Sequence, residues 1–244
     1  MSAFVPLLLL AQISTGAIVA RVKENDLKVS DLRAVGRMEI VTGTETKTRV
    51  FELSLLRQGV GYRARIRIRE PQSMAGTEFL VHAERGKRNK QWAYFPDLDL
   101  VREISGKSED DPFLGSDITY ADLAGGAHLD DLHHQLLGEE VFGSEPCYVM
   151  EGVPKHRITY GKLRGYVRKR DFVNVGAVFF DHEGGKIKDA VLSDVRELSG
   201  GALLAHRYEI RSSKGRTVLT LEDVVVNEGL AETEFTETAL GGKD

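Results

Sequence analysis

Histidine and aspartate gather between residues 128 and 134, where they could bind a metal ion. Imidazole nitrogens and carboxylate oxygens are common zinc ligands. However, His133 and His134 are adjacent and would point apart on a helix or a strand, and the sequence has no His-x-His or His-Glu-x-x-His motif. A glycine-rich phosphate loop is also missing. We therefore predict neither a metal site nor a cofactor at this group, which comprises His128, Asp130, Asp131, His133 and His134.

Two residues could act as nucleophiles. Ser116 lies in the sequence Leu-Gly-Ser-Asp, which lacks the second glycine of a Gly-x-Ser-x-Gly nucleophile elbow. Cys147 could be paired with His156, but it begins an apolar run, and a buried structural thiol explains it more simply. We therefore expect a protein that is not an enzyme.

Basic residues alternate with other types in the strand-like run from 62 to 69, where Arg63, Arg65, Arg67 and Arg69 would share one face. Such a row could bind phosphates or anionic lipid headgroups. Cross-strand pairing with the acidic residues of neighbouring strands is the alternative, and it favours a solvated face. The whole chain has 33 basic and 37 acidic residues, a balance that is not typical of nucleic-acid binders.

The first residues indicate export. The apolar run Phe4–Ala11, followed by small and polar residues, is typical of a secretory signal and too short for a membrane span. We expect residues 1–17 to be a signal peptide and residues 18–244 a single domain in the periplasm. A buried N-terminal strand or helix is the alternative reading of the apolar run.

The remaining 227 residues are dominated by alternation with period two, which is typical of half-buried antiparallel strands. About eleven such runs are joined by glycine-containing turns. The pattern predicts a mainly β protein with one strongly curved antiparallel sheet, whose apolar face must be covered. Residues 18–27 are spaced like a short amphipathic helix, and residues 105–138 form the longest non-strand insertion, a candidate lid.

A family resemblance adds to this reading. Residues 92–105 (WAYFPDLDLVREIS) and 111–123 (DPFLGSDITYADL) resemble the signature of the outer-membrane lipoprotein-sorting-protein-like family, and weaker similarities extend over the chain. The resemblance implies an incomplete β-barrel whose concave apolar face is capped by helices and loops, as in LolA-like carriers, which bind acyl chains. It further implies an exported, monomeric carrier or sensor of lipoprotein acyl chains or other lipids. An inner-membrane transporter or an outer-membrane acceptor would be its partner.

One alternating set of side chains should face such a cavity, although each of them could equally belong to an ordinary packed core. The predicted set is Phe51, Leu53, Leu55, Ala64, Ile66, Ile68, Phe79, Val81, Trp92, Tyr94, Val178 and Phe180. In the motif loop, glycine would permit an unusual backbone angle, and Ser116 or Asp117 would cap a short helix at 120–123. Asp117 could instead sense a ligand headgroup. The loop residues are Phe113, Gly115, Ser116, Asp117 and Tyr120.

A second function is open at this point. The curved sheet and the basic hairpin formed by Arg85, Lys87, Arg88 and Lys90 could form a protein-interaction module that docks a membrane partner without holding lipid.

Overall fold

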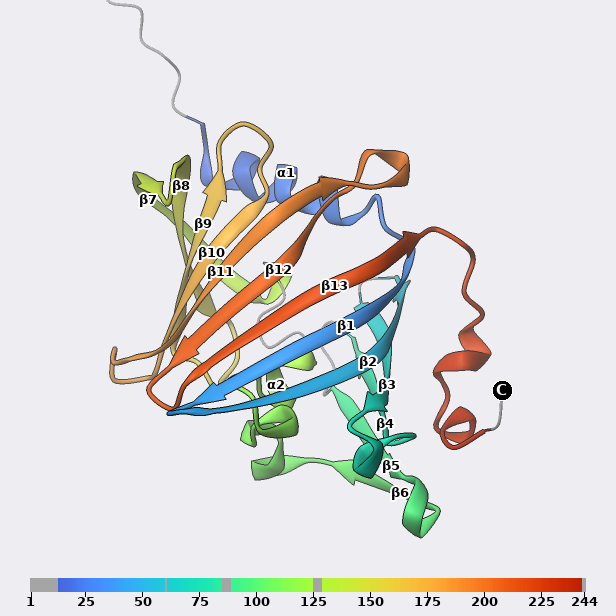
Figure 1. Cartoon of the computed structure of the whole chain (residues 1–244). Coiled ribbons are helices and arrows are strands. Elements are labelled where there is room, and N and C mark those ends of the chain that lie inside the picture. Colours follow the sequence, from blue (N-terminus) through green and yellow to red (C-terminus); the bar gives the residue numbers. More distant parts are fainter. Residues whose placement is uncertain (1–12, 60, 85–88, 125–128, 243–244) are drawn as a thin grey trace, which may run out of the picture.

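The protein is built on one curved antiparallel sheet (Figure 1). The computed structural model describes residues 13–59, 61–84, 89–124 and 129–242. Within them, thirteen strands follow the order β6-β5-β4-β3-β2-β1-β13-β12-β11-β10-β9-β8-β7, and the sheet stays open between β6 and β7. The strands are β1 Asp31–Thr42, β2 Glu45–Gln58, β3 Gly61–Glu70, β4 Glu78–Ala83, β5 Lys90–Phe95, β6 Leu100–Ile104, β7 Leu132–Phe142, β8 Glu145–Pro154, β9 Lys162–Arg168, β10 Asn174–Phe180, β11 Lys186–Glu197, β12 Leu203–Ser212 and β13 Arg216–Val226. The predicted mainly β, curved and incompletely closed sheet is confirmed.

The two strands beyond the predicted eleven are the edge strands β6 and β7. Strand β7 starts at Leu132, so the last part of the segment 105–138 is strand and not insertion. Its sequence hides this because Gly138 sits at an irregularity where the register with β8 shifts, which interrupts the alternation.

The core of the first half of the sheet lies on its concave face. Phe51 of β2 is opposite Ile68 of β3, and Ile66 is opposite Phe79 of β4, so these side chains share one face. Gly36 of β1 lies opposite Phe51, and a Cβ there would come within 2.3 Å of the phenyl ring. Glycine at this position therefore lets the Phe51 ring lie across β1.

Two α-helices occur in the described part of the chain, α1 (Thr15–Asp26) and α2 (Tyr120–Leu123), and both lie behind the sheet as seen in Figure 1. Helix α1 extends the predicted helix toward the N-terminus, with Ser14 as its cap: the Ala17 amide donates to the Ser14 hydroxyl at 3.2 Å. The expected signal cleavage after residue 17 would fall inside this helix, and it stays a prediction. No helix in the ranges described is long and apolar enough to cross a bilayer.

The last segment of the chain, 227–242, packs on the opposite, convex face of the first half of the sheet (Figure 1). Phe235 is fully buried there together with Leu80 of β4. The His82 ring nitrogen lies 2.7 Å from the Phe235 carbonyl oxygen. Both faces of β2–β5 are thus covered, the concave one by the insertion and the convex one by this segment.

Candidate functional site

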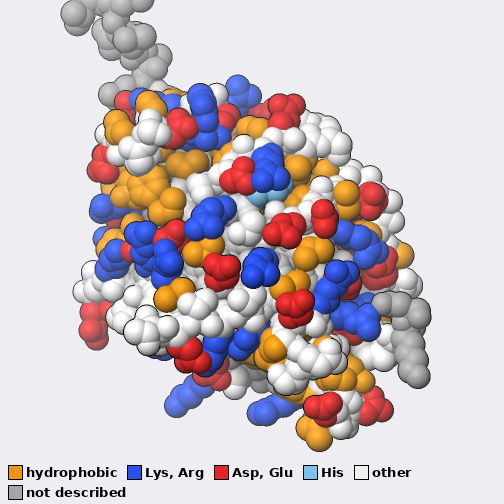
Figure 2. Space-filling model, viewed as in Figure 1, with side chains coloured by type: hydrophobic (Ala, Val, Ile, Leu, Met, Phe, Trp, Pro, Cys, Tyr) orange, Lys and Arg blue, Asp and Glu red, His pale blue; other side chains and the backbone are white. Residues whose placement is uncertain are grey.

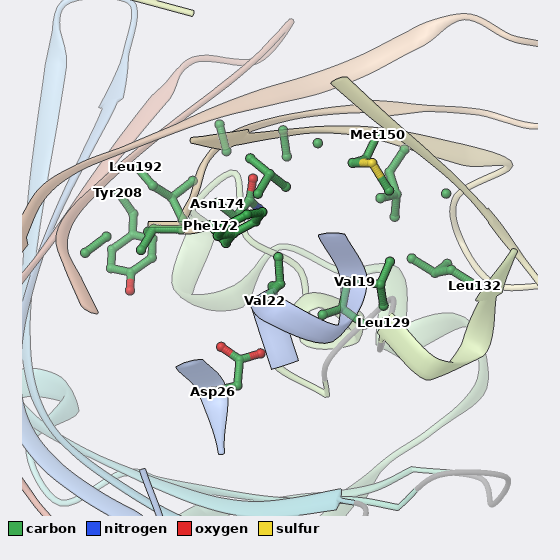
Figure 3. A pocket seen from close by; sticks show the side chains of 18 of the residues that line it. Val19, Val22, Asp26, Leu129, Leu132, Met150, Phe172, Asn174, Leu192 and Tyr208 are labelled. Carbon is green, nitrogen blue, oxygen red and sulfur yellow. The ribbon is translucent and has the colours of Figure 1, made fainter. Parts of the chain in front are cut away.

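A cavity of about 600 Å³ lies on the concave face of the second half of the sheet, under helix α1 (Figure 3). Its volume falls within the range of small-molecule pockets, roughly 300–1,000 Å³. The walls are mainly aliphatic and aromatic. They comprise Ile18, Val19, Val22, Asn25 and Asp26 of α1; Met150, Gly152, Leu163, Gly165, Val167, Ala177, Phe179, Lys188, Ala190, Leu192, Leu203, Leu204, Ala205, Tyr208 and Ile210 of β8–β12; and Tyr62, Ile118, Asp122, Leu129, Leu132, His134, Tyr160, Phe172, Val173 and Asn174.

Small residues at the centre of the sheet create the space. A row of paired positions crosses five strands, from Met150 through Gly165, Ala177 and Ala190 to Ile210. The three central members carry a methyl group or no side chain, while the outer two are large. Because side chains fill protein interiors to high density, such a run of small residues leaves a hollow unless another element fills it.

Helix α1 closes this hollow without filling it. Ile18, Val19 and Val22 form one stripe that faces the cavity, as Figure 3 shows for the two valines. The Asn25 side chain fastens the C-terminal end of the helix, because it accepts from the Leu203 amide at 2.8 Å and donates to the Leu203 carbonyl at 2.9 Å. At the other end, the Leu136 amide donates to the Thr15 hydroxyl at 3.2 Å.

A buried ion pair fastens the insertion to the cavity wall. The Lys188 ammonium on β11 donates to the Asp122 carboxylate of α2, and the Tyr160 hydroxyl donates to the same carboxylate at 2.5 Å. Lys188 also lies 5.1 Å from the centre of the Tyr160 ring and 5.2 Å from that of Phe179. Burial and the neighbouring Asp122 raise the pKa of Tyr160 far above its ordinary value. We call Asp122, Tyr160 and Lys188 the latch.

The motif loop is held to the sheet by Asp117. Its carboxylate accepts hydrogen bonds from the hydroxyls of Ser212 and Thr217, the latter at 2.7 Å, and its amide donates to the Thr217 hydroxyl at 2.9 Å. In the structure, Asp117 is thus fully engaged in fixing the loop to β12 and β13.

Other residues of the motif also serve the loop's structure. Gly115 has a φ of +82°, the unusual backbone angle that was predicted. Phe113 is 1% exposed and packs edge-on against Phe79, with 4.9 Å between ring centres, and Tyr120 packs against both rings. The predicted cap of α2 is corrected: Thr119 is the cap, in a capping box with Asp122, because Ser116 and Asp117 precede the turn that starts the helix.

The structure places the predicted cavity residues elsewhere, and none of them borders the 600 Å³ cavity. Those on the concave face belong to the packed core beneath the insertion or beside it, namely Phe51, Leu53, Leu55, Ala64, Ile66, Ile68, Phe79 and Val81. Trp92 and Tyr94 lie on the convex face, under the C-terminal segment. Val178 and Phe180 also occupy the face of β10 opposite the cavity, because Ala177 and Phe179 are the cavity-facing residues of that strand.

The candidate chemical groups Ser116, Cys147 and His134 each have a local environment that the structure describes. The Ser116 hydroxyl donates to the Phe113 carbonyl at 2.7 Å, and burial raises the pKa of the Cys147 thiol. His134 faces the cavity, with its ring nitrogen 2.6 Å from the Leu129 carbonyl oxygen. No group of three potential metal ligands occurs among the residues with a described placement, and His128 lies outside them.

The arginine row of β3 is paired with acidic side chains. Arg65 and Arg67 both lie near the buried Glu78 carboxylate, and Arg69 pairs with Glu52. The nearest oxygen of Glu232 is 4.0 Å from Arg63. Figure 2 shows side chains of both signs interspersed over the face it presents, with no extended area of one sign. These pairs favour the solvated-face interpretation of the row.

Comparisons with known proteins agree with this architecture. A structure of a DUF1329 family protein from Desulfovibrio piger has a TM-score of 0.87 at 24% identity, covering 94% of this chain and 100% of the other. A proposed outer membrane lipoprotein-sorting protein domain from Vibrio parahaemolyticus has a TM-score of 0.86 at 24% identity, covering 93% of this chain and 99% of the other. A LolA superfamily protein from Nitrosomonas europaea has a TM-score of 0.74 at 19% identity, covering 94% of this chain and 100% of the other.

A search among curated proteins finds no match. A family model with the description "Uncharacterized protein" matches residues 62–241, most of the chain. The chain belongs to this family, and its fold is that of the LolA-like lipoprotein-sorting proteins.

Proposed function

We propose that the protein is a non-catalytic carrier or sensor that holds an acyl chain of a lipoprotein, or another hydrophobic ligand, in the cavity under α1. The observation that carries the proposal is the cavity itself. The small residues Gly165, Ala177 and Ala190 form its wall on the sheet, and helix α1 closes it. Each methylene group that leaves water for such a cavity contributes about 0.8 kcal/mol to binding. An acyl chain therefore suits these walls, and the fold of lipoprotein-sorting proteins supports the same conclusion.

The proposed setting is the periplasm, where the protein would act in outer-membrane lipoprotein sorting or in a transporter-linked process. It would act as a monomer that receives its ligand from an inner-membrane transporter or passes it to an outer-membrane acceptor. The apolar segment Phe4–Ala11 supports export.

A matched pair of variants on β11 tests the site. Ala190→Phe places a ring in the cavity. Val191, the next residue of β11, points to the opposite face of the sheet, so Val191→Phe places the same ring outside the cavity. We expect Ala190→Phe to abolish binding of a fluorescent acyl-chain probe and Val191→Phe to retain it. Circular dichroism and thermal unfolding would confirm that both variants fold. Equal binding by the two folded variants would contradict the cavity as the ligand site.

A docking module without bound lipid is the second candidate, and one surface feature favours it. Phe95, Leu98 and Leu100 expose apolar side chains where β5 leads into the edge strand β6, and Leu98 is 71% exposed. In this case, membrane proteins captured by the wild-type chain would also be captured by Ala190→Phe and lost by Leu98→Asp.

A further inference from the structure

Asp26 and Tyr208 bring polar groups to one side of the cavity, where the apolar Leu192 also lies (Figure 3). In Figure 3, Tyr208 and Asp26 lie at one side, whereas Leu132, Leu129 and Met150 lie at the other. Asp26 is the last residue of α1, and Tyr208 projects from β12. A ligand that fills the whole space would therefore place a chain against the leucines and methionine and a polar group beside Asp26.

The charges that line the cavity do not cancel. Lys188 is compensated by Asp122 in the latch. Apart from His134, Asp26 is the remaining charged residue of the described lining. Arg57 of β2 is the basic residue near Asp26, but its guanidinium donates to the backbone carbonyls of Asp26 at 2.7 Å and of Val29 at 3.1 Å. Asp26 is therefore the carboxylate of the described lining that forms no ion pair.

A second acceptor lines the same cavity without a donor. Asn174, at the start of β10, has a buried side-chain oxygen that accepts no hydrogen bond. Buried acceptors in native proteins are nearly always satisfied, so this oxygen, which is covered by protein, is an exception in the cavity wall. Asp26 is therefore the acceptor of this pair that is open to a donor of a ligand.

We propose that the ligand is an amphiphile with a protonated amine, whose ammonium group binds the Asp26 carboxylate beside Tyr208 while its chain lies against Met150 and Leu132. This inference rests on the proposed carrier function and specifies the chemical class of its ligand. An amphiphile with an anionic head would bind more weakly, because its charge would be repelled by the Asp26 carboxylate.

The electrostatic environment of this site supports the assignment. Removal from water raises the pKa of the Asp26 carboxyl, against the opposing effect of Arg57, and burial raises the pKa of Tyr208 to about 12. In the protein without ligand, the ionised form of Asp26 is therefore less favourable than that of a carboxyl in water. A bound ammonium would stabilise the ionised form.

Three probes with the same twelve-carbon chain test the proposal: dodecylamine, dodecanol and dodecanoate, each below its micelle concentration. Calorimetry near pH 7, where the amine is protonated and the acid ionised, should rank the amine first and the carboxylate last. We expect at least about a tenfold difference between them, as charged hydrogen bonds provide. In Asp26→Asn the amine should fall to the affinity of the alcohol, and Asp26→Lys should favour dodecanoate.

Glu24→Gln is the matched control, since it removes an exposed acid of the same helix that pairs with Arg21 and does not line the cavity. It should bind all three probes like the wild type. If the wild type and Asp26→Asn bind the amine equally well, the amine assignment fails while the carrier function stands. If none of the three probes binds the wild type, and Ala190→Phe binds the fluorescent acyl-chain probe as the wild type does, the carrier function itself fails.

Discussion

The latch gives the sharpest prediction about stability, in the variant Asp122→Ala. The side chain of Lys188 is 6% exposed and that of Asp122 is 18% exposed, so their ion pair is largely screened from water. Removing one member of a buried pair costs about 3–5 kcal/mol, because the other charge is left without compensation. We expect the lower end, about 3 kcal/mol, since Lys188 keeps the Asp117 carbonyl at 3.4 Å and two aromatic rings.

For a chain of this size, each kcal/mol lowers the melting temperature by roughly 2–4 °C, so Asp122→Ala should melt about 6–12 °C below the wild type. Urea unfolding would measure the free energy directly. The double variant Asp122→Ala/Lys188→Met should be more stable than Asp122→Ala, because no buried charge remains unpaired. A loss below about 1 kcal/mol, the value of a surface pair, would refute the reasoning.

Three further predictions concern single side chains. Phe113→Ala should cost about 3–5 kcal/mol in urea unfolding because the ring is 1% exposed, whereas Leu98→Ala should change stability by less than about 0.5 kcal/mol. Gly115→Ala should cost roughly 1–2 kcal/mol, since its φ of +82° strains any residue with a Cβ, and a wild-type melting curve would contradict this. The raised pKa of Asp26 lowers stability as pH rises from the ordinary value of 3.8 through the raised one. Asp26→Asn should therefore be more stable than the wild type near neutral pH, with a gap that narrows on acidification, and unfolding curves at several pH values would show whether it does.

The sheet could be predicted because its strands alternate. In β3, arginines on one face and Ala64, Ile66 and Ile68 on the other define both the strand and its buried side. In β10 the rule fails, since Ala177, Val178, Phe179 and Phe180 are apolar on both faces and an irregularity after Asn174 resets the register. Composition alone cannot tell which face of such a strand meets the cavity.

The position of the cavity could not be predicted from the sequence, for a different reason. Both halves of the sheet offer an apolar concave face, and the structure shows that the insertion fills the first half with Phe113 and Tyr120. Helix α1 only bridges the second half. Which half stays hollow depends on where these elements dock. One usable signal did exist in the amphipathic helix predicted over residues 18–27. Ile18, Val19 and Val22 of its apolar face line the cavity, whereas Leu27 does not.

The central claim is that the cavity under α1 holds an acyl chain, and native mass spectrometry tests it most directly. The full chain would be purified without detergent from cell envelopes, and bound material would be identified after solvent extraction. We expect a one-to-one adduct with a chain-bearing compound in the wild type and in Val191→Phe, and its loss in Ala190→Phe. An unliganded mass for the wild type, both as purified and after incubation with acyl-chain amphiphiles, would contradict it.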